Sequence, residues 1–577
     1  MRILDDRILS AYATSVEALN ITSNALVSLN NFVQGQIQRF QTAINPKGVP
    51  GGTYTTPVSL PSFNSKNKDK EFAFYANDSW SITDRLTIDA GVRYEFYGPQ
   101  TKTDPKFDSN FYYPSVDMSV NSATPAEMIA ALKGGRVLDS SQSPVGGLWA
   151  ADWNNWAPRI GFAWDVNGDR RTSVRGGYGM AYERNFGDVT FGVLFNPPLY
   201  LVASIEAPTD VASLPIYTDP AGPFGGVVGV TKTIPAGKLS HVDQNIETAY
   251  SHFFGVAFQH QIGSNLVSRV EYSGSLGRKL YDMADVNKRG AELAFLGTGT
   301  AFARPNTQYA TFHSRGNRGR SEYRGVTLGV DSRMLGDTGL QFSANYTLGN
   351  AHDNLSSTFS DSSNEFNLGY LDAFDPMLDW GPAGFDVRHR GTVSGIWALP
   401  FARQSTGLVQ ALAADWQLNF IFTARTGFPF TLWDCTTGLA LCMRAQDPAG
   451  ISRKATSGAA TGNPNEYKLL DLSRIAAAAG SYMNPRTGNS DFGPYPSNMT
   501  ERNACRGPGV WNVDLAVTKR VRVQNRYAVQ FRLEAFNVFD HANMYANVGD
   551  ADLSSFDAVF GHKDGNRRLQ VGFKFEY

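Results

Sequence analysis

The chain has 577 residues with 52 basic and 53 acidic side chains, so its net charge of −1 gives no electrostatic reason to expect a nucleic-acid partner. Charged residues make up only 18%, whereas aromatic residues make up 12% and glycines number 56, a mixture typical of β-proteins. No stretch approaches the roughly 18 consecutive apolar residues of a transmembrane helix, so a membrane protein with this sequence would cross with strands.

The first thirty residues read as a helical or irregular segment before the main domain, which we expect to span residues 31–577. The sequence Met1–Asp6 has no basic region followed by an apolar core, so it predicts no secretory leader. A first strand is expected at Asn31–Gln41.

From residue 72 onward one unit repeats: an alternating strand, a short turn, a second alternating strand and a long irregular stretch. In the second strand, for example, apolar residues stand at every other position from Leu86 to Phe96, so they share one face. The thirteen strands predicted in this way are 72–80, 86–96, 156–164, 172–182, 250–261, 266–275, 324–333, 340–348, 387–398, 416–426, 510–520, 526–537 and 568–577. With residues 31–41, the expected total is about fourteen.

The connections differ in length at the two ends of these strands. Turns within each pair are short, whereas the stretches 99–155, 185–247 and 430–507 are long and rich in turn-forming residues, with no sign of a buried helix. Short helices are expected only at 125–132 and 470–479. Long structureless loops are uncommon in soluble domains, but outer-membrane barrels have short periplasmic turns and long extracellular loops. The predicted fold is therefore an all-β, antiparallel transmembrane β-barrel; tandem soluble sandwiches are the alternative.

Both faces of the predicted strands fit this interpretation. Aromatic residues near strand ends suit the membrane interface, where a ring lies at headgroup depth; they are Trp80, Trp164, Tyr182, Trp397 and Tyr577. Charged residues on the opposite faces suit a polar lumen; they are Asp89, Arg93, Glu95, Asp514, Arg532 and Glu534.

The sequence contains no pattern that indicates an enzyme, a metal site or a cofactor. The eight histidines are scattered, and zinc-binding, nucleophile-elbow and phosphate-loop motifs are missing. Residues 165–169 begin like a calcium loop, but Arg170 and Gly176 stand at the sixth and twelfth positions, so a hairpin turn is favoured. Cys435 and Cys442 either form a small disulfide, with Cys505 as the one remaining cysteine, or stay reduced.

Several motifs together resemble those of a known family. Asn77–Trp80, followed by Arg85–Glu95, is similar to a characteristic hairpin of TonB-dependent outer-membrane receptors. Segments that resemble the Oar-like branch of these receptors follow in the same order at Trp156–Trp164 with Val174–Gly179, Phe385–Arg390, Trp416–Leu418 with Thr426–Phe430, Arg506–Gly509 and Glu534–Asp540. The likeness covers nearly all of residues 72–577.

The resemblance implies a place in the bacterial outer membrane and a barrel of about 22 strands, of which this chain would form the C-terminal part. The plug and the carboxypeptidase-regulatory-like domain of such receptors have no counterpart here. The resemblance further implies that long outer loops capture a small ligand, such as a siderophore, cobalamin or a glycan. TonB, acting with ExbB and ExbD through the plug, would then drive uptake.

Individual site residues are expected on two grounds. Loop residues that we expect to be exposed are candidates for ligand contact: Tyr200, Tyr217, Trp433 and Tyr482. Phe573, Phe575 and Tyr577 resemble the terminal signal that the barrel-assembly machinery reads in this family, and their strand would face the outer-membrane lipid. Two other functions stay open, namely an Oar-like surface adhesion or secretion-related barrel, and a passive porin.

Overall fold

The structure is a computed structural model in which part of the chain is described. The described residues are 2–4, 39–59, 61, 67–114, 116–118, 122–184, 196–206, 228–357, 369–402, 404–434, 443–444, 467–468, 484–488, 492–493, 495, 497–523, 527–545, 550–552, 559–560 and 562–576.

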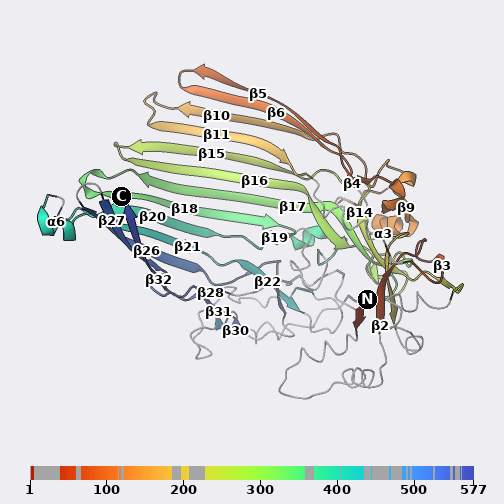
Figure 1. Cartoon of the computed structure of the whole chain (residues 1–577). Helices are drawn as coiled ribbons and strands as arrows, with labels where there is room; N and C mark the ends of the chain where they lie inside the picture. Colours follow the sequence, from red (N-terminus) through yellow and green to blue (C-terminus); the bar gives the residue numbers. More distant parts are fainter. Residues whose placement is uncertain are drawn as a thin grey trace, which may run out of the picture.

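Thirteen strands form one curved antiparallel sheet in which neighbours in sequence are neighbours in space (Figure 1). In order they are β5 (Glu71–Thr83), β6 (Leu86–Tyr97), β10 (Trp156–Asp165), β11 (Thr172–Tyr182), β15 (Tyr250–Ile262), β16 (Leu266–Asp285), β17 (Tyr309–Ser332), β18 (Leu340–Asp353), β20 (His389–Ala398), β21 (Trp416–Arg425), β26 (Val510–Val523), β27 (Tyr527–Phe536) and β32 (Arg568–Glu576). Each of the thirteen strands predicted from residue 72 onward has a counterpart in this sheet, although β16 and β17 extend well beyond the predicted 266–275 and 324–333. Two more, β14 (Gly237–Val242) and β19 (Gly381–Pro382), join one end and make a sheet of fifteen.

The expected fourteenth strand at Asn31–Gln41 is not a member of this sheet. Its described residues belong to β2 (Arg39–Ile44), which pairs with β1 (Arg2–Leu4) and β12 (Leu201–Glu206) in a separate sheet of three. The alternation of this segment predicts a strand but not the strand with which it pairs. Here one of its partners, β12, lies in a stretch expected to be a long loop. Within the described part of the chain, β5 and β32 each pair on one side only, so the large sheet is open between them.

The register gives the large sheet one apolar and one polar face. Phe420 lies opposite Gly395 and Leu515, whereas the next residue, Ile421, lies opposite Ser394 and Asp514. A Cβ atom at Gly395 would lie 2.6 Å from the ring of Phe420, so the glycine makes room for that ring. The apolar face is exposed, with Phe573 of β32 76% accessible, as expected for a wall that faces lipid.

The two ends of the sheet differ. One end carries the short turns, α6 (Gly407–Ala413) and the C-terminus; at the other end α3 (Pro125–Gly134), β9, β14 and β3 gather (Figure 1). We call these the turn end and the loop end. In the described part of the chain the other helices are α5 (Ala291–Leu296), η1 (Pro105–Phe107), η2 (Ser140–Gln142), η5 (Gly336–Thr338) and η7 (Pro376–Asp379). Among the described residues, no helix has the length and apolar character needed to cross a membrane.

Short strand pairs complete the described structure. They are β3 (Thr53–Thr55) with β13 (Thr231–Thr233), β4 (Asn67–Lys68) with β7 (Thr101–Lys102), β8 (Ser109–Tyr112) with β9 (Arg136–Asp139), β24 (Tyr467–Lys468) with β30 (Val559–Phe560), β28 (Asn543–Tyr545) with β31 (His562–Asp564), and β22 (Pro429–Asp434) with β23 (Met443–Arg444), β25 (Cys505–Arg506) and β29 (Asp550–Asp552).

Candidate functional site at the loop end

The longest strands carry a packed assembly at the loop end. β16 and β17 have 20 and 24 residues, about twice what a tilted bilayer crossing needs. Their far halves stay paired, since Asp282 lies opposite Gly316, and β14 adds a parallel neighbour that places His241 opposite Ser314. We define the loop-end unit as the described residues of 101–149, 237–249, 280–320, 353–384 and 484–506, which pack around these halves.

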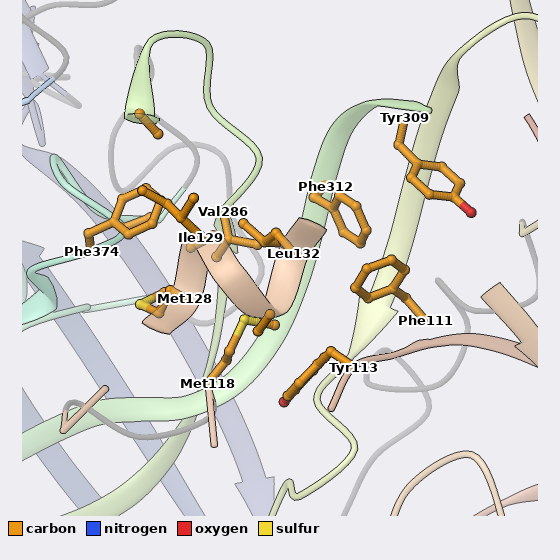
Figure 2. Close-up of a cluster of buried hydrophobic side chains, with 14 of the residues drawn as sticks. Phe111, Tyr113, Met118, Met128, Ile129, Leu132, Val286, Tyr309, Phe312 and Phe374 are labelled. Atoms are coloured by element: carbon orange, nitrogen blue, oxygen red, sulfur yellow. The ribbon is translucent and has the colours of Figure 1, made fainter. Parts of the chain in front are cut away.

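The loop-end unit has its own hydrophobic core. Figure 2 shows Met128, Ile129 and Leu132 of α3 beside Phe312 of β17, whose ring centre lies 4.7 Å from that of Phe111. α3 confirms the helix expected at 125–132, and its first turn is fixed by a capping box between Thr124 and Glu127. The expectation that the long loops hold no buried helix is wrong, because this short helix buries four side chains. The helix expected at 470–479 lies outside the described residues.

A buried ion pair joins the two long strands. Arg318 of β17 donates from Nε and Nη2 to the two carboxylate oxygens of Asp282 of β16, at 2.8 and 3.0 Å. The hydroxyl of Tyr370 donates to the same carboxylate at 2.9 Å, and the Gly316 amide donates at 2.9 Å. Asp282, Arg318 and Tyr370 are all buried, so the cluster fixes the loop that contains Tyr370 onto the β16–β17 ribbon.

A second buried cluster lies beside the first. Burial lowers the pKa of His241 to about 3, helped by the positive charges of Arg318 and Arg315. The imidazole bonds to Ser314 through Nδ1 at 2.9 Å, and the rings of Phe111 and Phe312 stand edge-on to it. Burial also raises the pKa of Asp243 to about 7, although the hydroxyl of Tyr113 donates to that carboxylate.

A cavity of about 640 Å³ opens in the loop-end unit. Phe295 of α5, Pro125 of α3, the 372–378 loop and the 493–501 segment form its walls. The lining residues are Pro125, Phe295, Asp372, Phe374, Asp375, Leu378, Gly493, Tyr495, Ser497, Met499, Thr500 and Glu501. A volume of this size accommodates a small organic ligand.

The deepest polar groups of the cavity are Asp372 and Thr500, which are only 3% and 6% exposed. Asp372 Oδ1 accepts from the amide of Phe374 at 2.9 Å. Burial raises the pKa of Asp372 to about 6; the positive charge of Lys288 opposes this rise and the negative charge of Asp375 adds to it. The hydroxyl of Thr500 is buried without a hydrogen-bond partner.

The four aromatic residues predicted to contact a ligand have different positions. Trp433 is 1% exposed rather than exposed; it packs beneath Leu378, Tyr495 and Met499, so it supports the cavity wall from behind. Tyr200 is half-buried and follows a turn that begins at Asn196. Tyr217 and Tyr482 lie outside the described residues, and contact of any of the four with a ligand stays a prediction.

The remaining predicted site residues are those of the proposed assembly signal and the three cysteines. Phe573 and Phe575 lie on the exposed apolar face of β32, whereas Tyr577 lies outside the described residues. Cys435 and Cys442 also lie outside them, and Cys505 is buried in β25.

Two predictions about charged side chains are confirmed. The predicted lumen pairs form, with Arg93 2.7 Å from Glu95 and Arg532 2.5 Å from Glu534. In the 165–169 segment, the carboxylate of Asp165 accepts from the amides of Gly168 and Arg170, as a hairpin turn requires.

The sequence reasoning missed the cavity residues. Asp372, Phe374 and Asp375 lie close together in a loop whose sequence otherwise predicts only turns. An acidic–aromatic alternation within such a loop is the signal that marks them, but their partners Phe295 and Thr500 lie 77 or more positions away.

The sequence of residues 11–570 matches a family described as an outer membrane beta barrel domain. The chain belongs to this family. Since the match covers nearly the whole chain, this protein is located in the outer membrane. No curated protein matches the chain at a significant level.

Solved structures similar to this chain include outer-membrane transporters. The outer membrane transporter YddB from Escherichia coli has a TM-score of 0.43 and 10% identity, over 88% of this chain and 54% of that one. The FrpB iron transporter from Neisseria meningitidis gives 0.40 and 10%, over 89% and 46%, and the ferric citrate transporter FecA gives 0.37 and 9%, over 90% and 47%. The chain thus spans about half the length of these proteins.

Proposed function

We propose that this chain is the barrel portion of a TonB-dependent outer-membrane receptor that captures a small ligand at the loop-end unit. The observation that carries the proposal is a packed, cavity-bearing assembly on one end of a sheet of the outer-membrane barrel family. A passive pore has no need for a folded unit with its own core at the mouth. The names of similar proteins, which include iron and ferric citrate transporters, agree with a role in uptake.

The finer parts of the proposal rest on the motifs of residues 72–577, which resemble the Oar-like branch. In this proposal the loop end faces the outside of the cell, and the plug and carboxypeptidase-regulatory-like domain belong to the complete receptor. TonB with ExbB and ExbD supplies the energy, and the barrel-assembly machinery inserts the barrel.

Uptake assays test the proposal. Cells that make the complete receptor, with and without TonB, are given radiolabelled ferric citrate, ferric pyoverdine or cobalamin. We expect at least one label to accumulate, and to stay at the surface when TonB is deleted. Accumulation that does not depend on TonB would support a porin instead. Failure to bind any of the labels, together with cell–cell adhesion that depends on the protein, would support the adhesion alternative.

A further inference from the structure

We propose that the loop-end cavity binds an organic cation, a ligand that carries a positive charge on an apolar and preferably aromatic body. This inference rests on the proposed function in so far as that ligand is the one the receptor takes up.

The charge of the cavity is negative. Asp372, Asp375 and Glu501 contribute carboxylates to its lining, and none of the lining residues that the structure describes is basic. Within the described part of the chain none of the three forms an ion pair. Lys288, whose positive charge acts on Asp372, is itself buried and donates to the carbonyl of Leu371 at 3.2 Å. One positive charge behind three carboxylates leaves the cavity with an excess of negative charge, which a cationic ligand would balance.

The walls between these carboxylates are apolar. The rings of Phe295 and Phe374 lie 5.0 Å apart at 47°, and Leu378 and Met499 complete the surface. A cation over an aromatic face is attracted by the ring quadrupole, and an apolar body gains by leaving water. A fully hydrated inorganic ion would gain nothing from these walls.

The spacing of the acidic groups also argues against a metal ion. Among the described residues, no three acidic, histidine or cysteine side chains lie close enough together to hold one. A ligand of several ångströms, rather than a single ion, is needed to contact the separate carboxylates.

Thr500 gives an independent sign of a missing ligand. Thr500 lines the cavity, and its buried hydroxyl has no hydrogen-bond partner among the residues that the structure describes, which is uncommon for a buried polar atom. A polar group on the bound ligand, such as an ammonium N–H or a hydroxyl, would satisfy it.

Titration calorimetry on the purified full chain tests the chemistry. The probes are benzyltrimethylammonium, whose charge does not change with pH, phenylacetate, which has a similar ring and a negative charge, and calcium. We expect saturable binding of benzyltrimethylammonium at pH 7.5, and affinity at least about tenfold weaker for the other two.

Single variants assign the binding to the cavity. Asp372→Asn keeps an oxygen that accepts from the Phe374 amide but removes the charge, so we expect about a tenfold loss of affinity for benzyltrimethylammonium. Asp84→Asn makes the same change on the exposed turn end and should leave binding unaltered. Asp375→Asn with Glu501→Gln changes only exposed carboxylates, so this double variant reports on charge even if the Asp372 variant folds poorly.

The pH dependence supplies a further readout. Because the pKa of Asp372 is raised to about 6, with Lys288, Asp375 and Glu501 as the charged groups around it, the affinity for benzyltrimethylammonium should fall between pH 7 and pH 5. In the Asp372→Asn variant this fall should largely vanish.

Equal binding of benzyltrimethylammonium and phenylacetate, or unchanged affinity in both the Asp372 and the double variant, would overturn the inference. TonB-dependent uptake of another ligand in that case would leave the proposed function intact. Saturable, Asp372-dependent binding of the cation without any TonB-dependent uptake would instead support the cavity chemistry and refute the transport proposal.

Discussion

At the scale of single residues, a buried ion pair joins the loops of the loop-end unit to the β16–β17 ribbon. Arg318 and Tyr370 both bond to the carboxylate of Asp282, in addition to the hydrophobic contacts of the core. A buried carboxylate that loses its cation keeps its desolvation cost without compensation. The stability of this end of the molecule therefore depends on a few partners.

Arg318→Met should destabilise the loop-end unit by about 3–5 kcal/mol, because it leaves the Asp282 carboxylate buried without its ion pair. Hydrogen exchange resolved by peptide should show lost protection at 280–285 and 313–320. The strand segment 322–332, which lies in the wall, should keep its protection.

The double variant Arg318→Met/Asp282→Leu is the matched control. It removes both charges, so it should recover part of the lost stability. If the single variant is as protected as the wild type, the ion pair contributes nothing and the prediction is wrong.

Asp243 should make the stability of the loop-end unit depend on pH. In the folded protein the pKa of Asp243 is about 7, above its ordinary value of 3.8. At a pH between these two values the folded state therefore keeps a proton that the unfolded state loses. The stabilisation is full below about pH 4 and is lost as pH rises through 7, on the order of 1 kcal/mol per pH unit. His241, with its lowered pKa, acts in the opposite direction.

Asp243→Asn removes this titration and leaves that of His241 in place. The free energy of unfolding of the variant, relative to that of the wild type, should rise from pH 4 to pH 7 and then level off. Exchange measurements at half-unit steps of pH would check this; a difference that stays constant across the window would show that Asp243 does not titrate there.

At the scale of elements, the last strand shows how the two faces of the wall differ. Val571 of β32 lies opposite Leu533 on the apolar face, and Gln570 lies opposite Glu534 on the polar face. The alternation that predicts the strand also predicts which residue tolerates charge.

Val571→Arg should cost about 2–4 kcal/mol near the middle of the bilayer, whereas Gln570→Arg should be close to neutral. The measurement is urea unfolding in lipid vesicles, read by heat-modifiable mobility on gels. Equal costs for the two variants would contradict the assignment of faces.

Deletion of Tyr577 tests the proposed assembly signal of Phe573, Phe575 and Tyr577. We expect less protein in the outer membrane, with unchanged ligand affinity in the fraction that assembles. Phe575→Leu, which keeps an apolar side chain, is a milder comparison; normal assembly of the Tyr577 deletion would refute the proposal.

The strands of the wall could be predicted from the sequence, whereas the packing between distant segments at the loop end could not. In each wall strand apolar and polar residues alternate with a period of two, and each strand pairs with its neighbour in sequence. The position of Leu86 or Phe420 within its strand therefore predicts the face on which it lies. The cavity instead joins Phe295, Asp372 and Thr500, which no short-range period connects. The exposure expected of Trp433 is wrong for the same reason, because segments distant in the sequence cover this loop tryptophan, while its contact with a ligand stays a prediction.

For the whole molecule, the number of strands constrains how the wall can close. All neighbours among the thirteen strands are antiparallel, so β5 and β32 run in the same direction. An antiparallel seam between them would require an odd number of further strands, because a membrane leaves no backbone edge unpaired. A barrel of about 22 strands, as the resemblance implies, would add nine and meet this condition.

Cysteines introduced at Ala76 of β5 and at Val571 or Phe573 of β32 test whether the two edges meet directly. We expect no cross-link within one chain, because other strands lie between the edges in the proposed barrel. Cysteines at the paired positions Leu533 and Val571 are the positive control. Efficient linkage of β5 to β32 would show a direct parallel seam.

The length of β16 and β17 has a consequence for what can reach the protein from outside. At about 3.3 Å per residue, the 24 residues of β17 extend roughly 80 Å, and a bilayer crossing uses only about 9–11 of them. The other residues of β17, 309–320, belong to the loop-end unit itself, so this unit is built directly on the continuation of the strands that form the wall. In the proposed orientation, with the loop end outside the cell, an antibody or a bacteriophage tail would therefore meet this unit before it meets the wall.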